Sequence, residues 1–180
     1  MEKKDLLKDV IKHIDIKSYN STELVDAMRN MSFTSRDTAR AADILMMMCK
    51  EKECTNILTL AGSTSAAGCM QVYVDMVRNK MIDVVVATGA SIIDMDLFEA
   101  LGFKHYIGEK ENVIPDTTLR ELYIDRIYDT YIDEEELQAC DHTTFEIANM
   151  LEARPYSSRE FIYEIGKWLH EGNAVKKDSL

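Results

Sequence analysis

Residues 56–96 read NILTLAGSTSAAGCMQVYVDMVRNKMIDVVVATGASIIDMD, and this stretch decides the fold. Two apolar runs, 56–62 and 81–87, are each predicted as a short strand that runs into a turn of small residues and then a helix. Strand, turn and helix in this order, twice over, are typical of a βαβ unit. Because both runs are almost continuously apolar, we expect the strands to be parallel and both faces of the sheet to be covered.

The two turns that follow these strands are the strongest candidates for a binding site. Residues 62–68 (GSTSAAG) offer hydroxyl groups and free amides at a helix start, which suit a phosphate. Residues 88–91 (TGAS) follow the neighbouring strand, so both turns should lie at the carboxyl edge of the sheet and outline a cleft for a dinucleotide. Neither turn has the dinucleotide fingerprint or the P-loop pattern, so an ordinary tight connection remains an alternative.

Two carboxylates, Asp94 and Asp96, stand near the start of the helix that follows the second turn. At a helix start they can cap free amides. They can equally bind a ribose hydroxyl or an ammonium group. Their spacing does not separate these uses.

Around this centre the chain divides into a helical lead-in at residues 1–53, the βαβ core at 54–108 and a mainly helical part at 109–180. A third short strand is expected at 104–107, and the methionines at 46–48 are expected to fill a core. Helices outside the core are predicted from apolar spacing and capping residues. Their expected starts are near Met1, Ser21 or Thr22, Ser35 or Asp37, Asp116, Asp133 and Ser157.

The composition indicates one globular domain. The chain has 180 residues, 46% hydrophobic and 29% charged, with no apolar stretch near the roughly 20 residues that a bilayer requires. Its charged start is not a secretory signal, so we expect a cytoplasmic protein. The net charge of −11 disfavours nucleic acid and suits cationic partners such as polyamines, although solubility alone also explains it.

Residues that carry chemistry elsewhere are scattered here. The four cysteines and four histidines show no metal-binding spacing and no Cys-His pairing, so we expect neither a metal site nor a cysteine nucleophile. Lys167 lies in an amphipathic helix and is predicted to be a surface lysine beside a buried Trp168. No residue of this chain is therefore predicted to be catalytic.

Several segments, taken in order, resemble the N-terminal half of deoxyhypusine synthases. They are SFT at 32–34 followed by Arg40 and Ala41, LAGSTS at 60–65, MIDVVVATGA at 81–90, and IDRIYD at 124–129, which is similar to the N-R-I-G-N segment of that family. The match covers roughly residues 32–169. Its most specific part is the M-[VI]-D-V-x-V-x-T stretch.

The resemblance implies a reaction, a fold and partners. The family transfers the aminobutyl group of spermidine to a lysine of a translation initiation factor, using NAD, on a Rossmann-like parallel sheet with flanking helices in a homotetramer. Residue by residue, Thr64 and Ser65 match the T-S of the first NAD turn of the family. Thr88, Gly89 and Ala90 stand where the family has T-A-G in the second, with the last two residues exchanged.

Two departures limit what is carried over. Where the family reads G-G-V-E-E-D, this chain has SIIDMD at 91–96, so Asp94 and Asp96 only partly match its cofactor- and substrate-binding glutamates, and an enzyme that makes homospermidine stays possible. The catalytic lysine and the glycine-rich cofactor segment of the family belong to a C-terminal half that these residues do not contain. Lys167 does not match that lysine in position or context.

Three hypotheses follow. The first is the NAD-binding half of an enzyme, a fold incomplete without a complementary C-terminal half. The second is a non-catalytic regulatory paralogue that activates a full-length relative, and the third is a plain small-ligand binding module. Under the first, the next central strand of the family would follow Leu180, so we expect an exposed strand edge that pairs with another chain.

Overall fold

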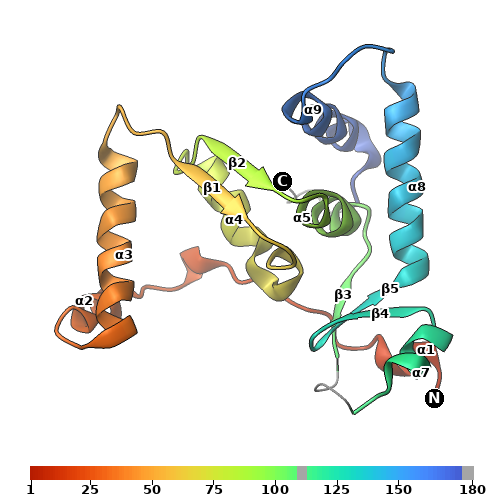
Figure 1. Ribbon diagram of the computed structural model, residues 1–180, viewed down its shortest axis with the longest axis horizontal. Coiled ribbons are helices and arrows are strands. Elements are labelled where there is room, and N and C mark those ends of the chain that lie inside the picture. The colour runs from red at the N-terminus through yellow and green to blue at the C-terminus, as the bar shows by residue number, and fades with distance from the viewer. Residues whose placement is uncertain (109–112, 176–180) are drawn as a thin grey trace.

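The computed structural model describes residues 1–108 and 113–175 and is a mixed α/β structure (Figure 1). Its strands are β1 (Ile57–Leu60), β2 (Val84–Ala87), β3 (His105–Ile107), β4 (Ile124–Ile127) and β5 (Thr130–Asp133). Its α-helices are α1 (Lys3–Leu6), α2 (Thr22–Met28), α3 (Phe33–Lys50), α4 (Met70–Arg78), α5 (Gly89–Ser91), α6 (Phe98–Ala100), α7 (Asp116–Glu121), α8 (Glu134–Met150) and α9 (Ser158–Trp168). Helical turns of other pitch are η1 (Ile16–Ser18), η2 (Ser65–Cys69), η3 (Ile92–Leu97) and η4 (Leu169–Asn173).

The two strands of the βαβ core form a parallel pair, as predicted. Ile57 of β1 lies opposite Val84 of β2, and α4 is the crossover between the strands. Within the described residues this sheet has no third strand, and Val84, Val85 and Val86 remain 41%, 38% and 54% exposed. The expectation that both faces are covered is therefore wrong for this chain by itself, because its described elements leave these valines open.

A second, antiparallel sheet has the strand order β3-β5-β4. The strand expected at 104–107 is present as β3, but it pairs with β5 and does not extend the parallel sheet. The β4–β5 hairpin lies in the part predicted as mainly helical, and local apolar spacing does not predict it. On β5, Tyr131 and Ile132 point to opposite faces and pack in two different buried clusters, which holds this short strand in place.

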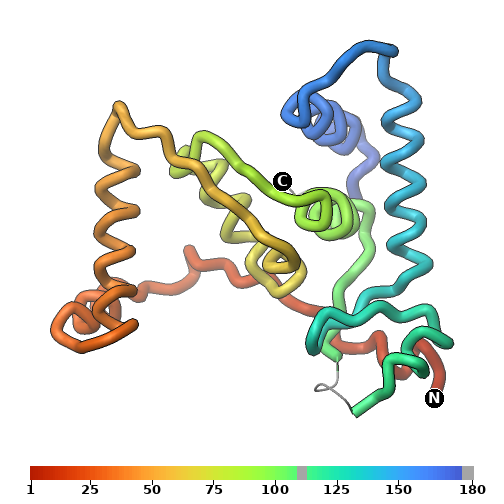
Figure 2. Tube along the Cα trace, viewed as in Figure 1, coloured from red at the N-terminus to blue at the C-terminus, as the bar shows by residue number. Residues whose placement is uncertain are grey.

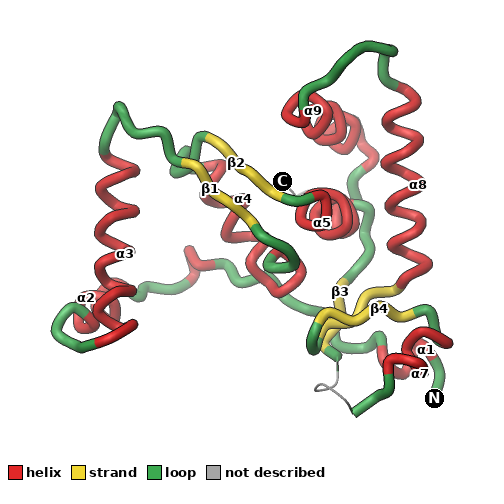
Figure 3. The backbone as a smooth tube through the Cα atoms, in the orientation of Figure 1, coloured by secondary structure: helices red, strands yellow, loops and turns green. Residues whose placement is uncertain are grey.

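The larger core lies among α8, α9 and the helical stretch that runs from α5 through η3 to α6 (Figures 1 and 3). Its buried members are Leu97, Phe98, Ala100, Ile132, Cys140, Ile147, Ile165 and Leu169. The predicted starts of α8 and α9 are confirmed, because Asp133 is the N-cap residue of α8 and Ser157 is the N-cap residue of α9. This core fixes the helix that begins directly after the second turn.

The N-terminal segment, residues 1–21, contains a short helix near the start predicted at Met1, but most of it is not helical. Only α1 and η1 are helical there, and the stretch between them is non-helical. Val10 forms a β-bridge with Tyr106 of β3, and the amide of Ile14 donates to the carbonyl oxygen of Gly68 at 3.0 Å. The segment is extended because its backbone bonds both to β3 and to η2, contacts that a local apolar stripe does not report.

α2 and α3 form a hairpin that extends away from the other described elements (Figure 2). α3 begins at Phe33, ahead of the predicted start at Ser35. Met46 and Met47 on α3 are 52% and 61% exposed. The expectation that residues 46–48 fill a core is therefore wrong for Met46 and Met47, whereas Met48 is half-buried.

Candidate functional site

The two predicted turns lie side by side. β1 and β2 are parallel and directly paired, so the residues that follow Leu60 and Ala87 emerge at the same edge of the sheet. The Ser91 hydroxyl donates to the carbonyl oxygen of Gly62 at 2.6 Å, which ties the second turn to the first. The proximity of the two turns is confirmed, and what they bind remains a prediction.

The first turn combines an open backbone with a buried hydroxyl. Gly62 has a φ of 60°, and nothing lies within 4 Å of the place where a Cβ would stand. Thr64 is exposed, and its Oγ1 accepts a hydrogen bond from the Tyr73 hydroxyl at 2.8 Å. Ser65 is fully buried, and within the described part of the chain its Oγ has no hydrogen-bond partner. Buried hydroxyls usually have a partner, so this one favours a site that something further completes.

The second turn leads into a helix start. Thr88 is the N-cap residue of α5, and the helical stretch continues from Gly89 through η3 to Ala100. Thr88 and Gly89 are exposed, and Ala90 is half-buried. The Ser91 amide donates to the Thr88 carbonyl oxygen at 3.1 Å. Because the Thr88 side chain makes no capping hydrogen bond within the described residues, the amides ahead of Ser91 are the ones open to an anionic group.

Asp94 and Asp96 lie inside η3, past the N-cap position that Thr88 occupies. The capping interpretation of these carboxylates is therefore wrong, and their binding of a ligand stays a prediction. Burial, reinforced by the negative charge of Asp141, raises the pKa of the half-buried Asp94 carboxyl. Asp96 is buried.

A pocket of about 380 Å³ opens between the first turn and the β4–β5 hairpin. Gly62 and Thr64 line it from the turn, and Tyr128 and Asp129 line it from the hairpin. These two hairpin residues belong to the segment that resembles N-R-I-G-N. That resemblance was the one feature of the sequence that pointed to them as functional residues. Their position beside the first turn could not be predicted, because the hairpin itself was not.

An adjoining pocket of about 910 Å³ shares Asp129 and Thr130 with the first one. It is bounded on its other side by the N-terminal segment, from which Lys8, Asp9 and Lys12 line it. The N-terminal segment is thus part of the surroundings of the first turn. The sequence gives no signal of this neighbourhood.

A buried polar cluster that sequence reasoning misses joins the N-terminal segment to α6 and β3. The Nε2 of His13 lies 2.8 and 2.7 Å from the two carboxylate oxygens of Glu99, and the Nδ1 of His105 lies 3.0 Å from one of them. All three side chains are at most 10% exposed. We interpret this cluster as stabilising the tertiary structure, because it connects three segments that are far apart along the chain.

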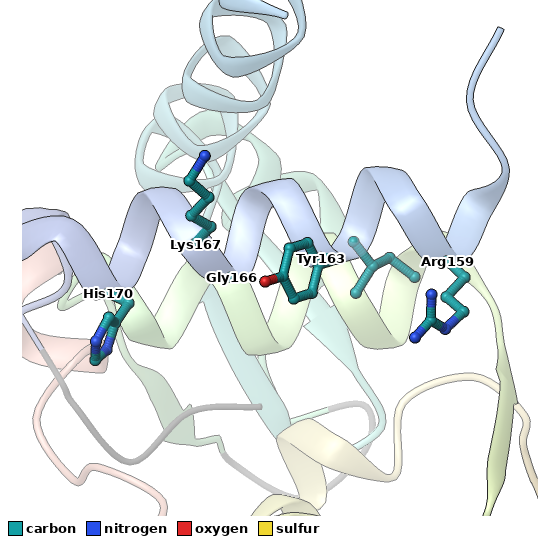
Figure 4. A pocket seen from close by; sticks show the side chains of 6 residues that line it. Arg159, Tyr163, Gly166, Lys167 and His170 are labelled. Carbon is teal, nitrogen blue, oxygen red and sulfur yellow. The ribbon is translucent and has the colours of Figure 1, made fainter.

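Arg159, Tyr163 and Lys167 of α9 and His170 of η4 line a pocket of about 490 Å³ (Figure 4). Lys167 is exposed, and its Nζ lies 3.8 Å from the Glu164 carboxylate. The neighbouring Trp168 is partly buried against the larger core. The prediction of a surface lysine is confirmed, and Trp168, predicted to be buried, is partly buried.

Within residues 1–108 and 113–175 there is no group of three or more His, Cys, Asp or Glu side chains placed to hold a metal ion. The four cysteines are free thiols. Among the helices of these residues, none is both long and apolar enough to cross a membrane.

Fold and site together define a class: a mixed α/β protein in which two small-residue turns meet at the carboxyl ends of paired parallel strands. The family model of deoxyhypusine synthase matches residues 23–180. The chain belongs to the deoxyhypusine synthase family, a transferase family whose members are generally NAD-dependent. The resemblance found in the sequence is thereby confirmed.

Similar proteins come from distant microbes. The chain is 65% identical to a deoxyhypusine synthase-like protein of Caulobacter vibrioides, over 99% of this chain and 48% of the relative. It is 58% identical to one of Coxiella burnetii, over 99% and 50%, and 37% identical to a probable deoxyhypusine synthase 2 of Methanosarcina acetivorans, over 93% and 47%. The chain thus spans about half the length of the curated relatives it matches.

Proposed function

We propose that this chain supplies the NAD-binding half of a deoxyhypusine synthase-like transferase. In this reaction the aminobutyl group of spermidine passes to a lysine of a translation initiation factor. The observation that carries the proposal is the hydrogen bond between Ser91 and Gly62, which joins the two turns at the carboxyl ends of paired parallel strands. The T-S and T-G-A residues carried over from the family lie in these same turns.

Three features of the two turns suit the binding of NAD. The open backbone at Gly62, the buried Ser65 hydroxyl without a described partner and the free helix start after Thr88 are features that a dinucleotide uses. NAD would supply the acceptor for the hydride removed from spermidine. The residues that would hold it are Thr64, Ser65, Thr88, Gly89 and Ala90.

Asp94 and Asp96 are the proposed substrate-binding residues. Spermidine is a polycation, and carboxylates are its natural partners in a protein of net charge −11. Since burial raises the pKa of the Asp94 carboxyl, an ammonium group brought beside it would favour the charged form. The pair therefore suits a cation that enters the site together with NAD.

We further propose that the active unit includes the part of the relatives that this chain does not cover, either in the same polypeptide or in a separate one. That part would add strands beside β2, making the sheet Rossmann-like, and would supply the catalytic lysine. The exposed valines of β2 support this, because parallel strands are normally buried on both faces. Units that contain both halves would assemble into a homotetramer.

The test is NAD binding by the complete assembly. Thr88→Leu and Ser65→Leu should fill the cleft and abolish NADH binding, measured as the fluorescence change on titration. Thr117→Leu, at an exposed position on α7, is the matched control and should bind NADH normally. If both variants bound NADH with unchanged affinity, these turns would not be part of the cofactor site.

The acceptor of the aminobutyl group distinguishes two reactions. The homospermidine-type reaction is the second candidate, favoured by Met95 at a position where the family has an acid. Mass spectrometry of an assay that contains spermidine, NAD, the initiation factor and a small diamine should show the mass gain on the factor. A gain on the diamine alone would favour the second candidate, and no gain on either would favour a regulatory paralogue or a binding module.

A further inference from the structure

The tight turn between β4 and β5 carries an exposed tyrosine in an unfavourable backbone conformation. Ile127 pairs with Thr130, so Tyr128 and Asp129 are the central residues of a two-residue hairpin loop. Tyr128 has a φ of 55°, a value that favours glycine, and its side chain is 75% exposed. Neither burial nor turn geometry explains a tyrosine at this position, and residues held in such conformations gather at functional sites.

The turn is held firmly from several sides. The amide of Gly108 donates to the Asp129 carbonyl oxygen at 2.7 Å. Arg126 donates to the Tyr128 carbonyl oxygen at 3.3 Å and to the Asp116 carboxylate at 2.7 Å. These bonds fix the backbone from which the Tyr128 ring projects, so the ring is presented on a rigid support.

The pocket that Tyr128 lines has the chemistry of a nucleoside site. The first turn contributes an open backbone at Gly62, Ala66 and Ile127 contribute apolar surface, and Asp129 contributes the one acidic residue of the lining. A tyrosine ring can stack on a planar base, and a carboxylate can accept hydrogen bonds from ribose hydroxyls. No lysine or arginine of the described chain lines this pocket.

The adjoining pocket is lined by charges of both signs. Lys8 and Lys12 line the adjoining pocket, which shares Asp129 and Thr130 with the first, and Asp9 lies there as well. Two lysines and two aspartates line this pocket, so their formal charges balance. The specific contact with a nucleoside is therefore expected in the first pocket, where the Tyr128 ring and the Asp129 carboxylate lie.

We propose that Tyr128 is a cofactor-binding residue, whose ring covers a planar ring of NAD at the first turn while Asp129 accepts from the attached ribose. The inference rests on the proposed function and adds residues to it. In the similar N-R-I-G-N segment, glycine stands at the position of Tyr128. Glycine adopts a positive φ without strain, whereas tyrosine at this position supplies an aromatic ring for contact with the cofactor.

Tyr128→Gly in the complete assembly is the decisive variant. It removes the ring and relieves the backbone, so NADH affinity should fall about tenfold while the melting temperature stays equal or rises. Tyr128→Phe should keep most of the affinity, because stacking needs the ring and not the hydroxyl. Tyr128→Asn, which tolerates a positive φ, repeats the test if the glycine variant does not fold.

The chain offers a matched control. Tyr123 also has a positive φ of 54° and is 56% exposed, but it does not line either pocket. Tyr123→Gly should therefore change the melting temperature in the same direction and leave NADH affinity unchanged. Equal losses of affinity in the two glycine variants would overturn the proposal.

The remaining outcomes are distinct. If Thr88→Leu abolishes NADH binding and Tyr128→Gly leaves it unchanged, the proposed function stands and the role of Tyr128 is refuted. If Thr88→Leu, Ser65→Leu and Tyr128→Gly all leave it unchanged, the proposed cofactor site itself is wrong. A change only in spermidine affinity, or only in oligomeric state by light scattering, would also refute the contact with NAD.

Discussion

At the scale of single residues, polar side chains inside this protein are buried against one another. The Glu99 carboxylate lies within hydrogen-bond distance of His13 Nε2 and of His105 Nδ1, so one carboxyl group joins the two rings. Asp75 is also buried, and its hydrogen bond to Lys17 at 2.8 Å lowers the pKa of its carboxyl. The contacts of His13 and Lys17 attach the N-terminal segment to α6 and α4.

Cys140 allows a prediction at this scale. It is buried on α8, its Sγ donates to the Ile93 carbonyl oxygen at 3.4 Å, and burial, with smaller effects of Asp141 and Asp94, raises its pKa to about 12. At pH 8 only about one Cys140 thiol in ten thousand would be a thiolate. Iodoacetamide should therefore label the exposed Cys49 first and Cys140 last, as read by peptide mass spectrometry.

The control is the same reaction in denaturant, where all four cysteines should react. Labelling of native Cys140 at a rate similar to that of Cys49 would contradict the burial of this thiol.

At the scale of elements, local sequence signals fix where helices begin. The Asp133 carboxylate accepts hydrogen bonds from the amides of Glu135 and Glu136 at 2.9 and 3.3 Å. Its Oδ1 also accepts a hydrogen bond from Lys3 Nζ at 2.6 Å. Ser157 and Glu160 form a reciprocal capping box at the start of α9. Acidic and hydroxyl residues ahead of an apolar run were enough to predict both starts.

Asp133→Ala tests how much the first of these caps contributes. It should lower the free energy of unfolding by about 1–2 kcal/mol through the lost cap, and somewhat more because Lys3 loses a partner. Asp141→Ala on the exposed face of α8 is the matched control and should change it by less than about 0.5 kcal/mol. Equal melting temperatures for the two variants, measured in the complete assembly, would show that the cap is dispensable.

At the scale of the whole molecule, apolar surface is left open in two places. The valines of β2 form one, and Ile44, Met46 and Met47 of α3 form the other. Large apolar side chains left exposed together on one element are candidates for contact with other polypeptide. A strand pair with an open edge adds unpaired backbone groups to that surface.

We predict that these 180 residues alone self-associate and bind a hydrophobic dye. Adding the polypeptide that corresponds to the remaining half of the relatives should lower dye fluorescence and raise the melting temperature, because binding to the folded state stabilises it. Light scattering and thermal melting of the chain, alone and with that polypeptide, make the measurement. A monodisperse monomer whose melting temperature ignores the partner would contradict this prediction.

The sequence by itself determined the family, the parallel pair of strands with their small-residue turns, and the capped starts of α8 and α9. These features depend on residues close together in the chain, so local apolar spacing and capping patterns report them. Only the tertiary structure decided that β3 joins an antiparallel sheet, that His13 and His105 meet at Glu99, and that Tyr128 lies beside Gly62. Such contacts join residues distant in the chain, and their free energy comes from packing and hydrogen bonds that no local pattern encodes.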